Sequence, residues 1–154
     1  MSQPFPHHYE ATLVWEEGSR AALSSGARPV LVGGPPPEFD GEPGWWSPEH
    51  LLLSAANLCL MTTYMVLAKK VGLVIAQYRS RAEGTLEKTR EGILFTRIAL
   101  HVEIQAPPQR LEEARKMVDT AKRYCIVSNT LKVPVEVDAA VAPSGTRSLD
   151  AGAA

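Results

Sequence analysis

The sequence lacks an excess of basic residues. Its 154 residues include 16 Lys and Arg against 17 Asp and Glu, which gives a net charge of −1. A phosphate backbone is bound through clustered positive charge, so we expect no nucleic-acid partner. The first residues contain neither the basic flank nor the apolar stretch of a secretory signal, and we therefore expect a cytoplasmic protein.

Cysteine is also scarce, because the chain contains only Cys59 and Cys125, far apart in the sequence. A purely structural disulfide is uncommon in a reducing compartment. Two alternatives follow for this pair. They are either free thiols buried as small hydrophobic groups or a redox pair.

The histidines do not form a metal-ligand pattern. No pair of them has ligand spacing beside a carboxylate or a cysteine. They are His7, His8, His50 and His101. We therefore expect no metal site and no other cofactor, and we interpret His101 as a solvent-facing residue on the polar face of a strand.

Charge is absent from the run 51–68, which lies inside a predicted helix. Ser47 suits the N-cap of this helix and Pro48 its first position, while Lys70 suits the last turn and Gly72 the stop. The helix is apolar nearly all round, which predicts burial on all sides. Its length reaches the lower limit of a membrane span. Its polar residues Ser54, Asn57, Thr62 and Thr63 favour a helix covered by a sheet, a second helix and a second subunit, so we expect no membrane partner.

Strands dominate the rest of the chain. They are predicted over 9–16, between turns at Gly18-Ser19 and Ser25-Gly26, and over 28–34, 73–90, 93–105 and 133–141. The strand over 9–16 alternates as a half-buried strand does, and the Pro- and Gly-rich stretch 33–46 is predicted to be a functional or disordered loop. This order of elements indicates an α+β protein, with a single domain over 1–142 and a disordered tail over 143–154.

A second helix is predicted over 109–125, with Cys125 on its apolar stripe. Cys59 lies in the uncharged run of the first helix. The two cysteines can therefore meet if the two helices pack together, although spacing alone does not require contact.

The segments around both cysteines resemble a known family. "SPEHLLLSAANLCL" is similar to the Asn/Ser-Pro-Glu-x-Leu…Ala-x-x-x-Cys segment of the OsmC/Ohr thiol-dependent peroxidases, and "CIVSNTL" to their Cys-Pro-Val-Ser motif. "FTRIALHVEI" resembles the strand between the two, and the resemblance covers about residues 8–140. It implies antiparallel sheets wrapped around long central helices in an intertwined homodimer.

The resemblance also implies a reaction. Cys59 would attack a hydroperoxide as a thiolate and become a sulfenic acid, and Cys125 would condense with it to a disulfide. An external dithiol would then reduce that disulfide. Organic hydroperoxides would be preferred to hydrogen peroxide, and a substrate pocket is predicted from Trp45, Trp46, Leu58 and Met61.

In this family an arginine and a glutamate assist the first cysteine. Glu49 stands at the matching Pro-Glu position, and Arg20 is the nearest candidate for the arginine, with Arg28 as the alternative. Glu49 precedes Cys59 by ten residues. This separation is about 15 Å along a straight helix. Either the helix breaks or Glu49 serves the site of the other subunit, and we predict the second arrangement.

Two positions depart from the family pattern. Leu58 stands where members usually have a small residue, and Ile126 where they usually have proline. These departures leave a second hypothesis open. The chain would then be a non-enzymatic dimeric protein that binds a small amphiphile in an apolar interface pocket.

Overall fold

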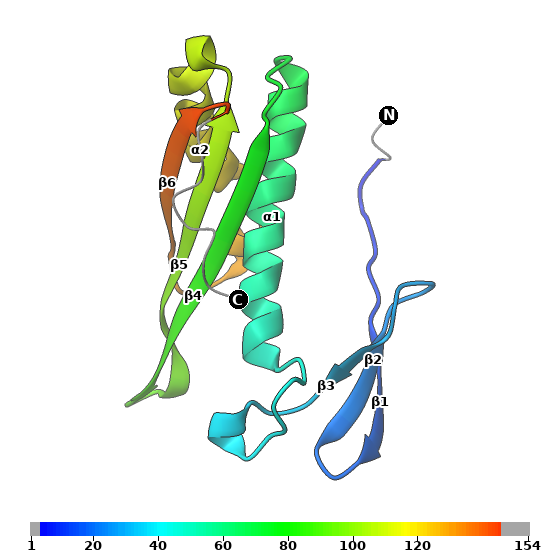
Figure 1. Ribbon diagram of the computed structural model, residues 1–154. Coiled ribbons are helices and arrows are strands. Elements are labelled where there is room, and N and C mark those ends of the chain that lie inside the picture. The colour runs from blue at the N-terminus through cyan, green and yellow to red at the C-terminus, as the bar shows by residue number, and fades with distance from the viewer. Residues whose placement is uncertain (1–3, 146–154) are drawn as a thin grey trace. The chain divides into compact units, whose positions relative to one another are not determined.

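The computed structural model describes residues 4–145 and divides the chain into two compact units, Met1–Leu52 and Leu53–Ala154 (Figure 1). The single domain expected over 1–142 stays a prediction. Of the predicted tail over 143–154, residues 146–154 lie outside the described residues. Pro143 ends a strand, and the Ser144 N–H donates a hydrogen bond to the Ala106 carbonyl at 2.9 Å.

The first unit contains a small antiparallel sheet. Its strands are β1 (Thr12–Glu17), β2 (Arg20–Ser24) and β3 (Leu31–Gly33), in the order β1-β2-β3. Gly18 makes the first turn with a φ of +52°, a conformation that glycine adopts without strain. The half-buried strand expected over 9–16 is wrong in two respects, since β1 starts at Thr12 and all its residues are exposed. The alternation of apolar and polar residues shows which side chains of β1 suit burial. No part of the described chain covers these apolar side chains.

The predicted loop over 33–46 is irregular except for a short 3₁₀ helix, η1 (Pro37–Phe39). Its end is tied back to the sheet through Trp46. The Trp46 N–H donates to the Val32 carbonyl at 3.0 Å, and the Trp46 carbonyl accepts from the Gly34 N–H at 3.1 Å. The chain thus enters the following helix from a defined position beside β3.

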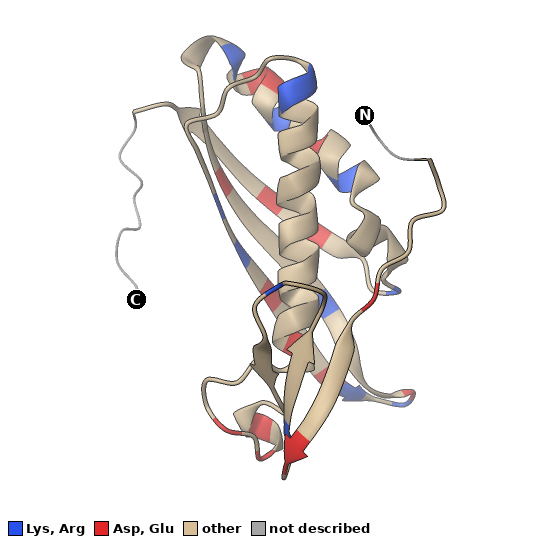
Figure 2. Cartoon of the chain, turned by 90° about the vertical axis from the view of Figure 1, so that its right-hand side faces the viewer, with Lys and Arg blue, Asp and Glu red and all other residues tan. Residues whose placement is uncertain are grey.

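The long helix α1 (Pro48–Lys70) begins and ends as predicted. The Ser47 hydroxyl accepts a hydrogen bond from the His50 N–H at 3.2 Å, which is the contact of an N-cap. Gly72 stops the helix with a φ of +63°, and its N–H bonds to the Lys69 carbonyl at 3.2 Å. Figure 2 shows no charged residue between the two ends of α1.

Burial of α1 on all sides is wrong for the described chain. The buried residues form one stripe, at Ala56, Leu60, Tyr64 and Ala68. On other faces, Leu58 and Val66 are 58% and 56% exposed. By length and composition α1 could also cross a membrane, and within residues 4–145 no other helix could, but the core helix of a soluble protein meets the same criterion.

The second unit is a three-stranded sheet with helices on one face (Figure 1). Its strands are β4 (Gln77–Thr89), β5 (Gly92–Ala106) and β6 (Val135–Pro143), in the order β4-β5-β6. Between β5 and β6 lie η2 (Pro108–Arg110), α2 (Leu111–Tyr124) and the short α3 (Ile126–Thr130), which was not predicted. β4 and β5 are antiparallel, whereas β6 runs parallel to β5 because the helical connection returns the chain to the same end.

One hydrophobic core joins α1, α2 and the sheet. The inward side chains of β5 are almost fully buried and are those predicted from the alternation, namely Ile98, Leu100, Val102 and Ile104. The apolar stripe of α2 is buried as predicted, at Ala114, Met117, Val118 and Ala121. The α+β fold class is therefore confirmed, while the homodimer stays a prediction.

Candidate active site

Cys59 lies at the middle of α1, partly buried against the core of the second unit. Its carbonyl accepts hydrogen bonds from the hydroxyls of Thr62 and Thr63, at 3.1 and 2.8 Å. Thr62 and Thr63 are therefore tolerated in an apolar helix, because their hydroxyls donate to a carbonyl of the preceding turn. The Asn57 side-chain oxygen is covered and has no hydrogen-bond partner within residues 4–145.

Cys125 lies between α2 and α3 and is completely buried. The Ser128 hydroxyl donates a hydrogen bond to its sulfur, with 3.1 Å between Oγ and Sγ. Burial raises the pKa of the Cys125 thiol above its ordinary value, and the Ser128 hydrogen bond opposes that rise.

Both thiols belong to the core of the second unit. Cys59 packs against the hydrophobic cluster that contains Cys125, and its proximity raises the pKa of the Cys125 thiol further. Both cysteines are free rather than joined in a disulfide. One sulfur lies on α1 and the other at the end of α2, and the redox pair stays a prediction.

The predicted helpers of Cys59 belong to the first unit. Arg20 Nε lies 2.8 Å from Glu16 Oε2, an ion pair that lacks the geometry of a hydrogen bond. Arg28 donates to the Ser25 carbonyl at 3.1 Å. The Glu49 Oε2 atom is covered and has no hydrogen-bond partner among the described residues. Because α1 is continuous from Pro48, a broken helix cannot bring Glu49 to the Cys59 of its own chain.

The residues predicted to line a substrate pocket have different environments. Trp45 packs on Gly34, where an added Cβ would lie 2.5 Å from the indole, and Trp46 is 42% exposed. Leu58 is exposed and Met61 partly buried, on either side of Cys59 in α1. The second unit also has a groove of about 570 Å³ that includes none of these four residues. Its lining consists of Thr62, Thr63, Val66, Leu67, Lys70 and Tyr124.

Sequence reasoning missed two hydroxyl groups, that of Ser128 beside Cys125 and that of Tyr78 in the core of the second unit. Ser128 lies in the quoted "CIVSNTL" segment, so its position three residues after Cys125 could have identified it. Tyr78 gave no such signal, because it lies on β4 in an ordinary strand sequence. Its ring packs on Tyr64 of α1, with 5.7 Å between ring centroids.

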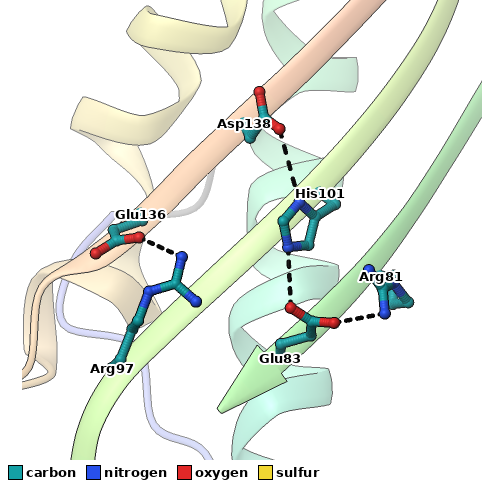
Figure 3. Close-up of polar contacts among 6 residues, drawn as sticks. All are labelled: Arg81, Glu83, Arg97, His101, Glu136 and Asp138. Carbon is teal, nitrogen blue, oxygen red and sulfur yellow. Dashed lines mark hydrogen bonds and ion pairs between the residues drawn. The ribbon is translucent and has the colours of Figure 1, made fainter. Parts of the chain in front are cut away.

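Polar contacts on the sheet join side chains of β4, β5 and β6 (Figure 3). His101 Nε2 lies 3.1 Å from Glu83 Oε2, and its Nδ1 lies 3.7 Å from Asp138 Oδ2. The hydrogen bond from His101 and the charge of Arg81 lower the pKa of Glu83. Within residues 4–145, no group of three or more His, Cys, Asp or Glu side chains is arranged to hold a metal ion. These contacts connect the three strands of the sheet.

Comparison with known proteins identifies the family. Residues 41–140 match the family model described as OsmC-like protein. The chain belongs to the OsmC-like protein family. A relative, peroxiredoxin OsmC of Escherichia coli strain K12, is 28% identical over 100 residues, which is 65% of this chain and 69% of that protein.

Solved structures show the same fold. An OsmC-like protein of unknown function from Vibrio cholerae aligns with a TM-score of 0.79 and 17% identity, over 88% of this chain and 100% of that one. The organic hydroperoxide resistance protein OsmC from Legionella pneumophila aligns with a TM-score of 0.71 and 23% identity, over 90% and 98% of the two chains. At these identities the structural similarity shows the fold alone.

Proposed function

We propose that this OsmC-like protein is a thiol-dependent peroxidase that reduces organic hydroperoxides, and hydrogen peroxide more weakly. The single observation that carries the proposal is that Cys59 of α1 packs against the core cluster that contains Cys125, close enough to raise the pKa of that thiol. The 28% identity to peroxiredoxin OsmC of Escherichia coli supports a peroxidase-type role.

The proposed catalytic cycle has three steps, which are oxidation of Cys59, closure of the disulfide and reduction of the disulfide. The Cys59 thiolate attacks the distal oxygen of the hydroperoxide, the O–O bond breaks, and the alkoxide leaves as an alcohol after taking a proton. Cys59 is then a sulfenic acid. The Cys125 sulfur attacks the Cys59 sulfur, hydroxide leaves and takes the Cys125 proton, and the products are a disulfide and water. An external dithiol reduces the disulfide by thiol–disulfide exchange.

The environment of Cys125 favours this order of events. Burial and the neighbouring Cys59 both raise the pKa of the Cys125 thiol, so it stays protonated while Cys59 is reduced. Oxidation converts Cys59 to a neutral sulfenic acid and removes its charge from beside Cys125. Cys125 then ionises more readily, at the stage when its attack is needed.

The proposal also assigns roles to residues that would assist Cys59. We assign Arg20 to bind the Cys59 thiolate and the peroxide, with Arg28 as the alternative. Glu49 of a partner subunit would orient that arginine through a bidentate ion pair. The Glu49 Oε2 atom supports this, because it is covered and has no partner among residues 4–145, and a covered carboxylate oxygen is stabilised by a cation that donates to it. Trp45, Trp46, Leu58 and Met61 would contact the organic tail of the substrate.

A thiol titration tests the function. The reduced protein is treated with one equivalent of cumene hydroperoxide, and its free thiols are counted before and after. Loss of both thiols in the parent, loss of only one in Cys125→Ser and loss of none in Cys59→Ser would support the peroxidase. Survival of both thiols in excess hydroperoxide would favour the binding protein that Leu58 and Ile126 leave open.

A further inference from the structure

Arg110 connects the start of α2 to the end of α1. It is the last residue of η2, and its guanidinium donates to the Gly72 carbonyl at 2.7 Å and to the Val71 carbonyl at 3.0 Å. The Glu113 carboxylate accepts from the same guanidinium at both oxygens, each at 2.7 Å. Val71 and Gly72 directly follow the last residue of α1. Glu113 therefore orients a guanidinium that is bonded to the end of the other helix.

The two helices run in opposite directions. Arg110 joins the start of α2 to the end of α1. At the far end of α2, its last residue Tyr124 lines one groove together with Thr62 and Thr63 of α1. These two threonines lie one turn after Cys59 and bond to its carbonyl. From the Arg110 contact, α2 thus leads back along α1 towards the turn that holds Cys59.

The lengths of the two segments match. Cys59 precedes Gly72 by 13 residues, and Cys125 follows Arg110 by 15 residues. At the helical rise these separations are about 20 Å and about 22 Å. The contact between Arg110 and Gly72 therefore brings both cysteines to nearly the same height along the helix pair, where both belong to or pack against one core cluster.

We propose that Arg110 is a positioning residue for disulfide closure, because it fixes the register in which α2 presents Cys125 beside Cys59. This inference rests on the proposed function, since it concerns the second step of that cycle. In that step the Cys125 thiol gives up its proton and its sulfur bonds to the Cys59 sulfur. The S–O bond of the sulfenic acid breaks, and hydroxide takes the proton and leaves as water.

Closure is sensitive to this register. A disulfide needs Cβ atoms about 3.5–4.5 Å apart, and a slip of one residue moves a helix by about 1.5 Å along its axis. The carbonyls that follow a helix are acceptors at fixed positions, and the planar guanidinium can bond to two of them and to a carboxylate together. Lysine keeps the charge of Arg110 but not this planar set of donors, so Arg110→Lys loosens the register without removing the cation.

The first test measures the stability of the disulfide and needs no hydroperoxide. The protein is equilibrated with mixtures of reduced and oxidised dithiothreitol, quenched in acid and alkylated with N-ethylmaleimide, and the disulfide is measured by mass spectrometry. Arg110→Lys is expected to lower the equilibrium constant for closure about tenfold, since the sulfurs are less well aligned. Lys116→Ala removes an exposed cation of α2 and is expected to leave the constant unchanged. An Arg110→Lys constant equal to that of the parent overturns the inference.

A second control separates register from general stability. Ser47→Ala weakens the cap at the other end of α1 and leaves the Arg110 contacts in place. It is expected to lower Tm and to keep the parent equilibrium constant for closure. Equal losses of that constant in Ser47→Ala and Arg110→Lys would show that Arg110 acts through stability alone and would overturn the inference.

The last test follows one turnover. After one equivalent of cumene hydroperoxide, sulfenic acid is trapped with dimedone and disulfide is measured by mass spectrometry. Arg110→Lys is expected to form the Cys59 sulfenic acid at the parent rate and to close the disulfide about tenfold more slowly. Closure at the parent rate overturns the inference. If the hydroperoxide oxidises neither cysteine of the parent, the proposed function fails, and the dithiothreitol equilibrium still decides the role of Arg110.

Discussion

Ser128 donates its hydroxyl proton to the sulfur of Cys125 over 3.1 Å, from a position three residues further along the chain. The bond forms because the backbone turns from the end of α2 into α3 at Cys125. It connects the buried thiol to a local donor and opposes the rise in thiol pKa that burial causes. The second cysteine motif therefore supplies both the sulfur and a group that makes it more acidic.

Replacement of Ser128 is expected to slow disulfide closure at neutral pH. In Ser128→Ala the pKa of Cys125 rises, because a group that lowers it is lost. At pH values below the thiol pKa, closure is slower than in the parent by several-fold, and the rates converge once the pH exceeds both pKa values. Stopped-flow closure rates across a pH series check this.

Thr130→Val is the control for Ser128→Ala. It removes a hydroxyl from the same short helix, but that hydroxyl donates to the Ile126 carbonyl rather than to sulfur. This variant is expected to follow the parent at every pH. Closure rates of Ser128→Ala equal to those of the parent throughout the series would show that the 3.1 Å contact has no part in the step.

Arg110 is expected to hold the C-terminal end of α1. Its guanidinium donates to the Gly72 carbonyl at 2.7 Å and to the Val71 carbonyl at 3.0 Å, while Glu113 accepts from it at both carboxylate oxygens. Arg110→Ala leaves these acceptors unpaired and is expected to lower Tm by a few degrees. Lys116→Ala removes an exposed cation of α2 and serves as the control, with no expected change.

The Arg110 effect also has a defined pH dependence. The hydrogen bonds from Arg110 lower the pKa of Glu113 below its ordinary value. The pair therefore stabilises the fold fully above the ordinary carboxyl pKa of about 4, and this contribution is lost as the pH falls through the lower folded-state value. The difference in Tm between parent and Arg110→Ala is expected to narrow in acid. A difference that widened in acid would contradict the assignment.

Loss of the N-cap of α1 is expected to reduce the free energy of unfolding by about 1 kcal/mol. Ser47 is completely buried, and its hydroxyl accepts from the His50 N–H at 3.2 Å, so Ser47→Ala leaves a donor in the first turn without its partner. Ser54→Ala replaces an exposed serine of the same helix and is expected to be neutral. Urea unfolding monitored by circular dichroism compares the two, and equal midpoints would exclude a capping role.

Much of the fold was predictable because local chemistry encodes it. The ends of α1 follow from Ser47, Pro48 and Gly72, whose backbone preferences act within a few residues. The inward face of β5 follows from strict alternation, since a strand with one buried face needs apolar side chains at every second position. The placement of both cysteines at the core of the second unit followed from their positions on the apolar sides of two helices.

Other features depend on partners that sequence alone does not identify. The apolar residues of β1 and the exposed side of α1 indicate surfaces that suit burial, but not which chain covers them. Arg20 was selected as the nearest candidate for the arginine that the family has on its N-terminal hairpin, whereas its ion pair with Glu16 depends on how the hairpin turns. The Tyr78 hydroxyl is covered and has no hydrogen-bond partner within residues 4–145, which could not be predicted, because a missing hydrogen bond is a property of the packed core and leaves no pattern in a strand.

Glu49 is expected to serve the active site of a partner subunit. Within one chain, continuous α1 keeps Glu49 about 15 Å from Cys59 along the helix axis, too far for both to contact one arginine. Glu49→Gln alone is expected to lower the rate of Cys59 oxidation by roughly tenfold or more, since the arginine loses a charged partner.

Mixed dimers of Glu49→Gln and Cys59→Ser chains distinguish the two arrangements. If Glu49 acts across the interface, one site in each mixed dimer combines an intact Cys59 with the intact Glu49 of the other chain. Mixing the slow Glu49→Gln protein with the inactive Cys59→Ser protein then raises activity above that of either one. If Glu49 acts within its own chain, both sites of the mixed dimer stay defective. Restored hydroperoxide consumption after subunit exchange, absent when either variant is mixed with the double variant, would place the carboxylate in the partner. A mixture no more active than its components would contradict both the shared site and the dimer that it requires.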